Sequence, residues 1–157
     1  MKSRELQRIW WDWLSTAERL NRSLAEQQAA LSLRDVARVE SIQPELDLMM
    51  ARLQDIDKNA VASTQSLAEQ LETPPTVRSI VEALTPAEAR QVESLSTRIK
   101  VVGENLRQRL DRNRKLLENE LMYVGGSLTL IAKAAQEQHG AFGSQSTPGS
   151  ILVDQVA

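Results

Sequence analysis

The chain has 157 residues, enough for one domain or two very small ones, and its 41% hydrophobic, 25% charged and only 3% aromatic residues favour helices over strands. The absence of cysteine excludes disulfides and thiolate chemistry, and a single histidine, His139, excludes multi-histidine metal sites. A net charge of −2 argues against nucleic-acid binding driven by overall charge. We therefore expect an all-α protein that is not an enzyme and has no catalytic residue, metal or cofactor.

Targeting and membrane signals are not visible in the sequence. The chain begins Met1-Lys2-Ser3-Arg4-Glu5, and charged residues interrupt the apolar ones every few positions after it, so the N-terminus has no apolar core of a signal peptide. The longest weakly polar run, residues 121–132, is shorter than the roughly 18 to 20 residues that a bilayer span needs. We expect a cytoplasmic protein without membrane insertion.

The first 31 residues show the heptad spacing of a helix that packs along another helix. The apolar positions are Leu6, Trp10, Trp13, Ala17, Leu20, Leu24 and Leu31, with Gln27 as the one polar residue among them. This spacing predicts a helix over about residues 3–31. Ser32-Leu33-Arg34-Asp35 has the pattern of a capping box, which predicts a turn and the start of a second helix.

The three tryptophans near the N-terminus point in two directions. Trp10 and Trp13 lie near the apolar positions, whereas Trp11 points almost opposite. We interpret Trp10 and Trp13 as core anchors and Trp11 as a surface side chain. The alternative is a patch around Trp11 for a partner or for self-association.

A second apolar series predicts a helix over about residues 33–71. Its positions are Val39, Ile42, Leu46, Met49, Leu53, Ile56 and Ala60. Because the spacing continues through Pro44, we expect a kink there and not a loop, with weaker helix at residues 63–66. A short helix over about residues 77–84 then leads to the last element.

The third long helix begins at the clearest local signal in the sequence. Thr85-Pro86-Ala87-Glu88 combines an N-cap threonine, a proline at the first helical position and a glutamate at the third. The apolar face that follows predicts a helix over about residues 86–138, with a bend at Gly125-Gly126. Asn113 lies on this face, and we interpret it as a buried polar residue that fixes the helix register.

Together these elements predict one helical domain over residues 1–138 and a flexible tail over residues 139–157. The fold class is all-α: an elongated antiparallel bundle or coiled coil of three main helices, of which the third is the longest. The basic residues of the third helix and the acidic residues of the second are expected to match each other in charge. An acidic protein partner is the alternative, and nucleic acid is disfavoured because no aromatic side chains are interleaved with the basic ones.

Because the third helix outruns the other two, part of its apolar face should lack a cover, and such faces mark binding sites. We expect it to bind an amphipathic helix of a partner; the tail or the segment 77–84 could cover it instead. The candidate partner-binding residues are Leu117, Leu121, Val124, Leu128, Ile131, Phe142, Gly143, Ile151 and Leu152.

Two short motifs resemble the FlgN family of flagellar type III export chaperones. They are Asn105 with Asn113 and Leu116-Leu117, and Phe142-Gly143 followed by Gly149, Asp154 and Ala157. The family usually has tyrosine where this chain has Phe142.

The resemblance implies a cytoplasmic chaperone that binds the amphipathic C-terminal segments of hook-associated subunits of the FlgK and FlgL type. It would prevent their premature assembly and deliver them to the export apparatus, with the tail contacting a component of the export gate. The alternative is a structural coiled-coil scaffold or tether that binds no client.

Overall fold

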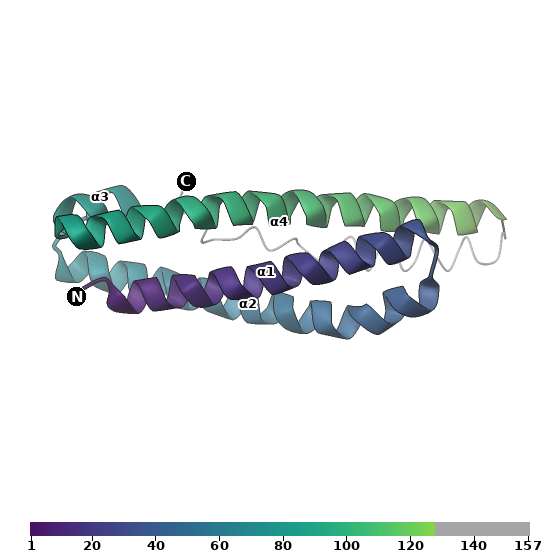
Figure 1. Ribbon diagram of the computed structural model, residues 1–157, viewed down its shortest axis with the longest axis horizontal. Coiled ribbons are helices and arrows are strands. Elements are labelled where there is room, and N and C mark those ends of the chain that lie inside the picture. The colour runs from purple at the N-terminus through teal and green to yellow at the C-terminus, as the bar shows by residue number, and fades with distance from the viewer. Residues whose placement is uncertain (128–157) are drawn as a thin grey trace.

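The computed structural model describes the backbone of residues 1–127 and the side chains of residues 1–122, and this part of the chain folds into four helices. They are α1 (Arg4–Ser32), α2 (Val36–Gln70), α3 (Val77–Ala83) and α4 (Pro86–Ser127). The three long helices lie side by side, and the short α3 sits at the end of the molecule that holds the N-terminus (Figure 1). Within residues 1–127 the prediction of an all-helical protein is confirmed, with four helices in total.

α1 and α4 run in the same direction, and α2 runs opposite to both (Figure 1). Hydrogen bonds and ion pairs join α1 and the turn after it to residues that lie 80 to 89 positions further along the chain. These pairs are Ser3–Glu88, Gln7–Gln91, Glu18–Arg98, Leu24–Asn113 and Arg34–Glu120. A nearly constant separation over the full length of α1 is the mark of two parallel helices in one register.

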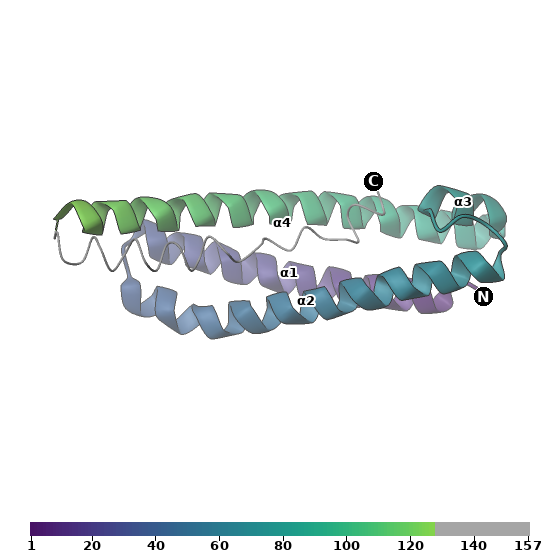
Figure 2. The same cartoon turned by 180° about the vertical axis from the view of Figure 1, so that it is seen from behind.

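α1 is the central helix of the molecule. It packs along both α2 and α4, whereas the backbones of α2 and α4 rarely approach each other closely. Seen from behind, α1 lies between them in the half of the bundle near the α1–α2 turn, and α2 crosses in front of α1 toward the other end (Figure 2). The core is therefore built around α1, whose Trp10, Trp13 and Leu20 are at most 1% exposed.

The turn between α1 and α2 differs from the predicted capping box. The N-cap of α2 is Asp35, whose side chain accepts a hydrogen bond from the backbone N–H of Arg38 at 3.2 Å. Ser32 is the last residue of α1, and its hydroxyl donates to the carbonyl of Gln28. The prediction of a turn is confirmed, but the cap lies three residues later than expected because α1 continues through Ser32.

Both α1 and α2 end in a Schellman motif that contains no glycine. After α1, the backbone N–H of Arg34 donates to the carbonyl of Leu31, and that of Asp35 donates to the carbonyl of Ala30. After α2, the backbone N–H of Glu72 donates to the carbonyl of Glu69, and that of Thr73 donates to the carbonyl of Ala68. The motif requires a left-handed residue, and Arg34 (φ 53°) and Glu72 (φ 55°) adopt that conformation. Non-glycine side chains there disfavour the folded state.

α2 is one continuous helix, so the weakening expected at residues 63–66 is wrong. Thr64 is buried, and its hydroxyl donates to the carbonyl of Ala60 at 2.8 Å, a contact that a helix accommodates. The helix also runs through Pro44, as expected. Pro44 is exposed, so water can reach the backbone carbonyl that loses its partner.

Thr85 caps the start of α4 as predicted, whereas the Glu88 carboxylate binds the Thr85 hydroxyl and the N-terminal Ser3. Thr85 Oγ1 accepts from Glu88 N–H at 3.5 Å and donates to Glu88 Oε2 at 3.1 Å. Glu88 Oε1 accepts from the backbone N–H of Ser3 at 3.1 Å and from its hydroxyl at 2.9 Å. Ser3 and Glu88 are both buried. The carboxylate of Glu88 therefore links the N-cap residue of α4 to the start of α1.

α4 is the longest helix, as predicted, and includes Gly125-Gly126 before the described part ends. Residues 128–138 of the predicted helix and the predicted tail, 139–157, lie outside the described residues. None of the helices in residues 1–127 combines the length and hydropathy that a bilayer span requires.

Candidate functional site

A groove of about 390 Å³ runs between α2 and α4, with α1 at its base. Its apolar base is formed by Trp13, Leu20, Leu53, Leu106 and Leu110, together with Gly103. Its rims carry polar and charged side chains: Gln54 and Asp57 on α2, and Glu104, Arg107, Gln108, Asp111 and Arg114 on α4. An apolar base between polar rims is the pattern of a site for an amphipathic helix.

A buried hydrogen bond fixes one wall of the groove. Trp13 Nε1 donates to Asp57 Oδ1 at 2.7 Å, and Trp13 and Asp57 are 0% and 5% exposed. The bond joins α1 to α2 across the base, because the indole N–H and the carboxylate oxygen would each lose hydration without a partner. The expectation that Trp10 and Trp13 are core residues is confirmed.

A polar layer crosses the bundle beyond the groove and joins three helices. Asn113 on α4 is 2% exposed, and its Nδ2 donates to the Leu24 carbonyl at 2.7 Å and to Gln27 Oε1 at 3.0 Å. Gln27 Nε2 then donates to Gln43 Oε1 on α2 at 3.3 Å. The prediction that Asn113 is a buried polar residue is confirmed, and Gln27, the polar exception in the first apolar series, is its partner.

Two of the predicted partner-binding residues, Leu117 and Leu121, lie on α4 beyond the residues that line the groove. Leu117 and Leu121 are half-buried, and they follow Leu110 by 7 and 11 residues, which places all three on one side of the helix. Val124 falls within α4. The remaining candidates, Leu128, Ile131, Phe142, Gly143, Ile151 and Leu152, lie outside the described residues.

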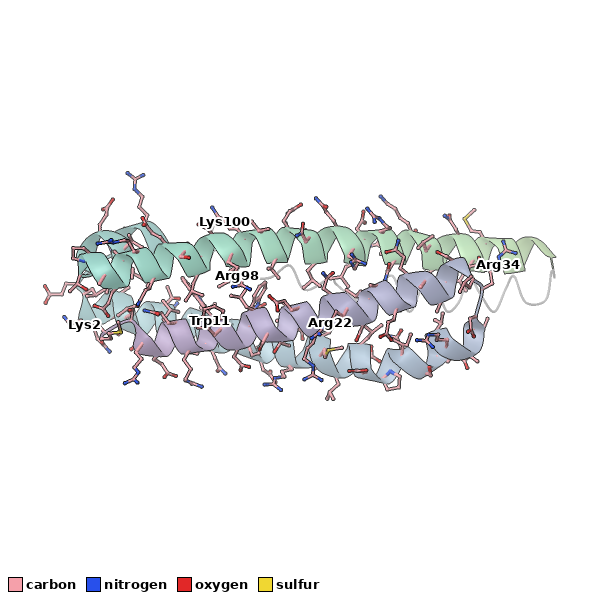
Figure 3. All side chains as sticks on the ribbon, viewed as in Figure 1. Lys2, Trp11, Arg22, Arg34, Arg98 and Lys100 are labelled. Carbon is pink, nitrogen blue, oxygen red and sulfur yellow. The ribbon has the colours of Figure 1, made fainter. Side chains whose placement is uncertain are left out.

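The cover that the α1–α2 hairpin gives to α4 ends near Glu120. Arg34 in the turn lies 3.1 Å from Glu120, and α4 continues beyond this pair (Figures 1 and 3). Leu33 and Val36 in the same turn are 80% and 66% exposed. The end of the molecule thus combines half-buried leucines of α4 with exposed apolar side chains of the turn.

Trp11 lies at the surface, as expected, and contacts α4. It is 51% exposed, and the guanidinium carbon of Arg98 lies 5.4 Å from its ring centroid, within cation–π range. Arg98 also pairs with Glu18 of α1 at 3.3 Å (Figure 3). For Arg98 the carboxylate thus comes from α1. The expected charge matching between the second and third long helices stays a prediction.

Ion pairs also join α2 to α1. These pairs are Arg52–Asp12, Arg19–Glu45 and Arg38–Glu26. All of these side chains are well exposed, so the pairs guide the choice and orientation of helices more than they stabilise them. Within residues 1–127, no group of three or more histidine, cysteine or acidic side chains is arranged to hold a metal ion.

Residues 1–127 thus form an elongated helical bundle with a groove between two of its long helices. The family model described as "FlgN protein" matches residues 1–147, and the chain belongs to this family of flagellar chaperones. A search of curated proteins finds no match, and a search of solved structures finds none.

The groove and the predicted partner-binding residues occupy different parts of α4. The predicted residues begin at Leu117, whereas the groove extends back along α4 to Gly103. The one available signal was Gly103 itself, a glycine among the apolar residues of a long helix.

Proposed function

We propose that this protein is a cytoplasmic export chaperone that binds the amphipathic C-terminal segments of hook-associated subunits of the FlgK and FlgL type. It prevents their premature assembly and delivers them to the type III export apparatus. Membership of the FlgN family supports a flagellar chaperone role in general. The observation that supports the client class is the groove between α2 and α4, together with the half-buried Leu117 and Leu121 further along α4.

The proposed mechanism is that the groove buries the apolar face through which the client segment assembles. A client segment in the groove hides the face with which it would polymerise. Ordering the segment costs about 2–5 kcal/mol of the interaction energy, so the complex can be specific and still release its client. In this proposal the client site continues along the chain through Val124, Leu128 and Ile131. The tail contacts the client or a component of the export gate through Phe142, Gly143, Ile151 and Leu152.

The test is co-expression of the full chain with the C-terminal segment of each hook-associated subunit, followed by size-exclusion chromatography with light scattering. We expect a complex with at least one of these segments. Leu121→Asp should abolish the complex and keep the helical circular dichroism spectrum, because Leu121 is only half-buried.

Two variants serve as controls. Met122→Asp changes the next residue, which is 74% exposed, and should leave the complex intact. Leu20→Asp places a charge at a position that is 1% exposed and should unfold the bundle. Failure of every client segment to bind the folded wild type would contradict the proposal and favour the scaffold alternative.

A further inference from the structure

One face of α1 and α4 lies opposite to the groove. The groove is lined on α1 by Trp13 and Leu20. Trp11 and Arg22 each lie two positions from one of these residues, and two positions rotate a helix by about 200°. Trp11 and Arg22 therefore point to the other side of α1, where both are exposed, and Figure 3 shows them on the side turned to the viewer. This second face is separate from the proposed client site.

Arg98 adds α4 to the same face. Its guanidinium carbon lies 5.4 Å from the Trp11 ring centroid, and it pairs with Glu18 at 3.3 Å. Arg109 and Arg112 follow Arg98 by 11 and 14 residues, about three and four turns, and so return to the same side of α4. Arg109 is half-buried and Arg112 is exposed. The face thus combines one tryptophan with basic side chains from two parallel helices.

Like charges meet across α1 and α4 at one level of this face. Trp11 and Arg98 are 87 positions apart, and Arg22 and Arg109 are also 87 positions apart. The second pair lies 11 residues, or about three turns, further along both helices. The register that brings Arg98 to Trp11 therefore brings Arg109 to the level of Arg22. Because like charges repel, this arrangement disfavours the folded state.

Ion pairs join α4 to α1 or to the turn after it on both sides of this level. Arg98 pairs with Glu18 on one side, and Arg34 pairs with Glu120 on the other. Three arginines of the face form no ion pair or hydrogen bond within the part of the chain that the structure describes: Arg22, Arg109 and Arg112. They leave a positive surface on a chain whose net charge is −2.

We propose that this α1–α4 basic face, formed by Trp11, Arg22, Arg98, Arg109 and Arg112, docks an acidic α-helix of a partner protein. The inference goes beyond the proposed function, because it concerns a second surface and a second partner. The shape of the face favours a helix, since its basic side chains extend over about three turns, or roughly 16 Å, of two parallel helices. A third helix that lies along them presents carboxylates at the same interval.

The chemistry of the partner follows from the two kinds of side chain on the face. Guanidinium groups pair best with carboxylates, so acidic side chains of the partner face the arginines. An apolar residue of the partner packs on the exposed half of Trp11 and on Val101, which is 57% exposed and follows Arg98 by three residues. Trp11 and Val101 offer little apolar area for insertion into lipid, so a protein helix fits this face better than a membrane does.

The test uses the full chain and a synthetic helical peptide with leucine along one face and glutamate on both sides of it. Fluorescence anisotropy of the labelled peptide gives its Kd. Arg22→Glu and Arg112→Glu each replace an exposed arginine, one on α1 and one on α4. Each should weaken binding roughly tenfold, because attraction becomes repulsion. Both variants should keep the wild-type circular dichroism spectrum.

Three controls assign the binding to this face. Lys58→Glu makes the same change of charge at an exposed position of α2 and should leave the Kd unchanged. Leu121→Asp should bind the acidic peptide as the wild type does, because Leu121 is not part of the α1–α4 basic face. A peptide with lysine in place of glutamate should not bind the wild type.

Four outcomes would overturn the inference. The acidic peptide could fail to bind the wild type, or bind it no more tightly than it binds Arg22→Glu and Arg112→Glu. Loss of the peptide in Leu121→Asp means that it occupies the proposed client site. Tighter binding of a DNA oligonucleotide, or of vesicles of equal phosphatidylserine and phosphatidylcholine, with loss in Arg112→Glu, means that the face binds phosphates. The client complex is measured separately with the hook-associated segments, so failure of either proposal leaves the other standing.

Discussion

The side-chain amides of Asn113 and Gln27 meet at 3.0 Å inside the bundle, where both residues are at most 4% exposed. The same Asn113 nitrogen donates to the Leu24 carbonyl, and Gln27 continues the connection to Gln43 on α2. A polar layer of this kind can be satisfied in only one alignment of the helices. It therefore fixes the register of α4 on α1.

Asn113→Ala should lower the free energy of unfolding by about 2 kcal/mol, because it removes two hydrogen bonds and leaves Gln27 Oε1 buried without its donor. Urea denaturation followed by circular dichroism measures the change. Asn119→Ala is the matched control, since Asn119 is an exposed asparagine on the same helix, and it should change stability by less than about 0.5 kcal/mol. Equal effects of the two substitutions would contradict the role assigned to the polar layer.

Trp13→Phe should destabilise the protein by about 3 kcal/mol, since it removes the donor to the buried Asp57 carboxylate and part of the core volume. Trp11→Phe is the matched comparison two residues away. The Trp11 ring is half exposed, and a phenylalanine ring can still stack with the Arg98 guanidinium. We therefore expect Trp11→Phe to change the free energy of unfolding by less than about 0.5 kcal/mol. Thermal and urea unfolding distinguish the two variants, and a small effect of Trp13→Phe would show that the Trp13–Asp57 bond contributes little.

Glu88 should make stability depend on pH in the acid range. The hydrogen bond from the Ser3 backbone N–H, with further ones from the Ser3 and Thr85 hydroxyls, lowers the pKa of Glu88 below its ordinary value of 4.5, and burial opposes this only in part. The unfolded chain therefore binds the proton more readily than the folded one. The ionised Glu88 carboxylate therefore stabilises the folded state fully above pH 4.5. This contribution is lost as the pH falls through the lower pKa that Glu88 has in the folded state.

Glu88→Gln should lower the free energy of unfolding by about 2 kcal/mol at neutral pH. Below pH 4.5 the free energies of unfolding of the variant and the wild type should approach each other. Urea unfolding at a series of pH values measures this. Glu93→Gln, on an exposed part of α4, controls for the loss of one negative charge. If the difference in the free energy of unfolding between the wild type and Glu88→Gln stays constant as the pH falls below 4.5, the pH dependence does not come from Glu88 ionisation.

Glu72→Gly should stabilise the protein by about 1 kcal/mol, because Glu72 holds a left-handed backbone conformation that glycine adopts without steric cost. The two hydrogen bonds of the Schellman motif use backbone groups only and remain in the variant. Glu69→Gly, inside the last turn of α2, is the opposite control and should destabilise by about 1 kcal/mol. Melting temperatures give the sign of each change directly.

The sequence predicts each helix better than it predicts how the helices meet. The apolar spacing identifies the buried side of α1, and Thr85 and Glu88 mark the start of α4, because both signals are local. The ends of α1 and α2 lack their usual signal, since Arg34 and Glu72 stand where glycine is common. The pattern that indicated a cap at Ser32 was therefore misread.

The opening between α2 and α4 could not be predicted from periodicity. Leu53 on α2 and Leu106 on α4 both show the spacing of buried residues, and both are buried. The spacing does not tell which helix they face, and it is α1 that both helices pack against. Asn113 and Gln27 were recognisable as polar exceptions, but only the structure shows that they are partners.

The parallel pairing of α1 with α4 also determines the order in which the protein assembles. α1 and α2 are joined by a turn of three residues, whereas the contacts of α1 with α4 close segments of 80 to 89 residues. Short closures cost less chain entropy and form sooner. We therefore expect the N-terminal hairpin to form first, with the side of α1 that faces α4 exposed to water until α4 packs against it. Pulse-labelled hydrogen exchange during refolding should show protection of α1 and α2 before α4.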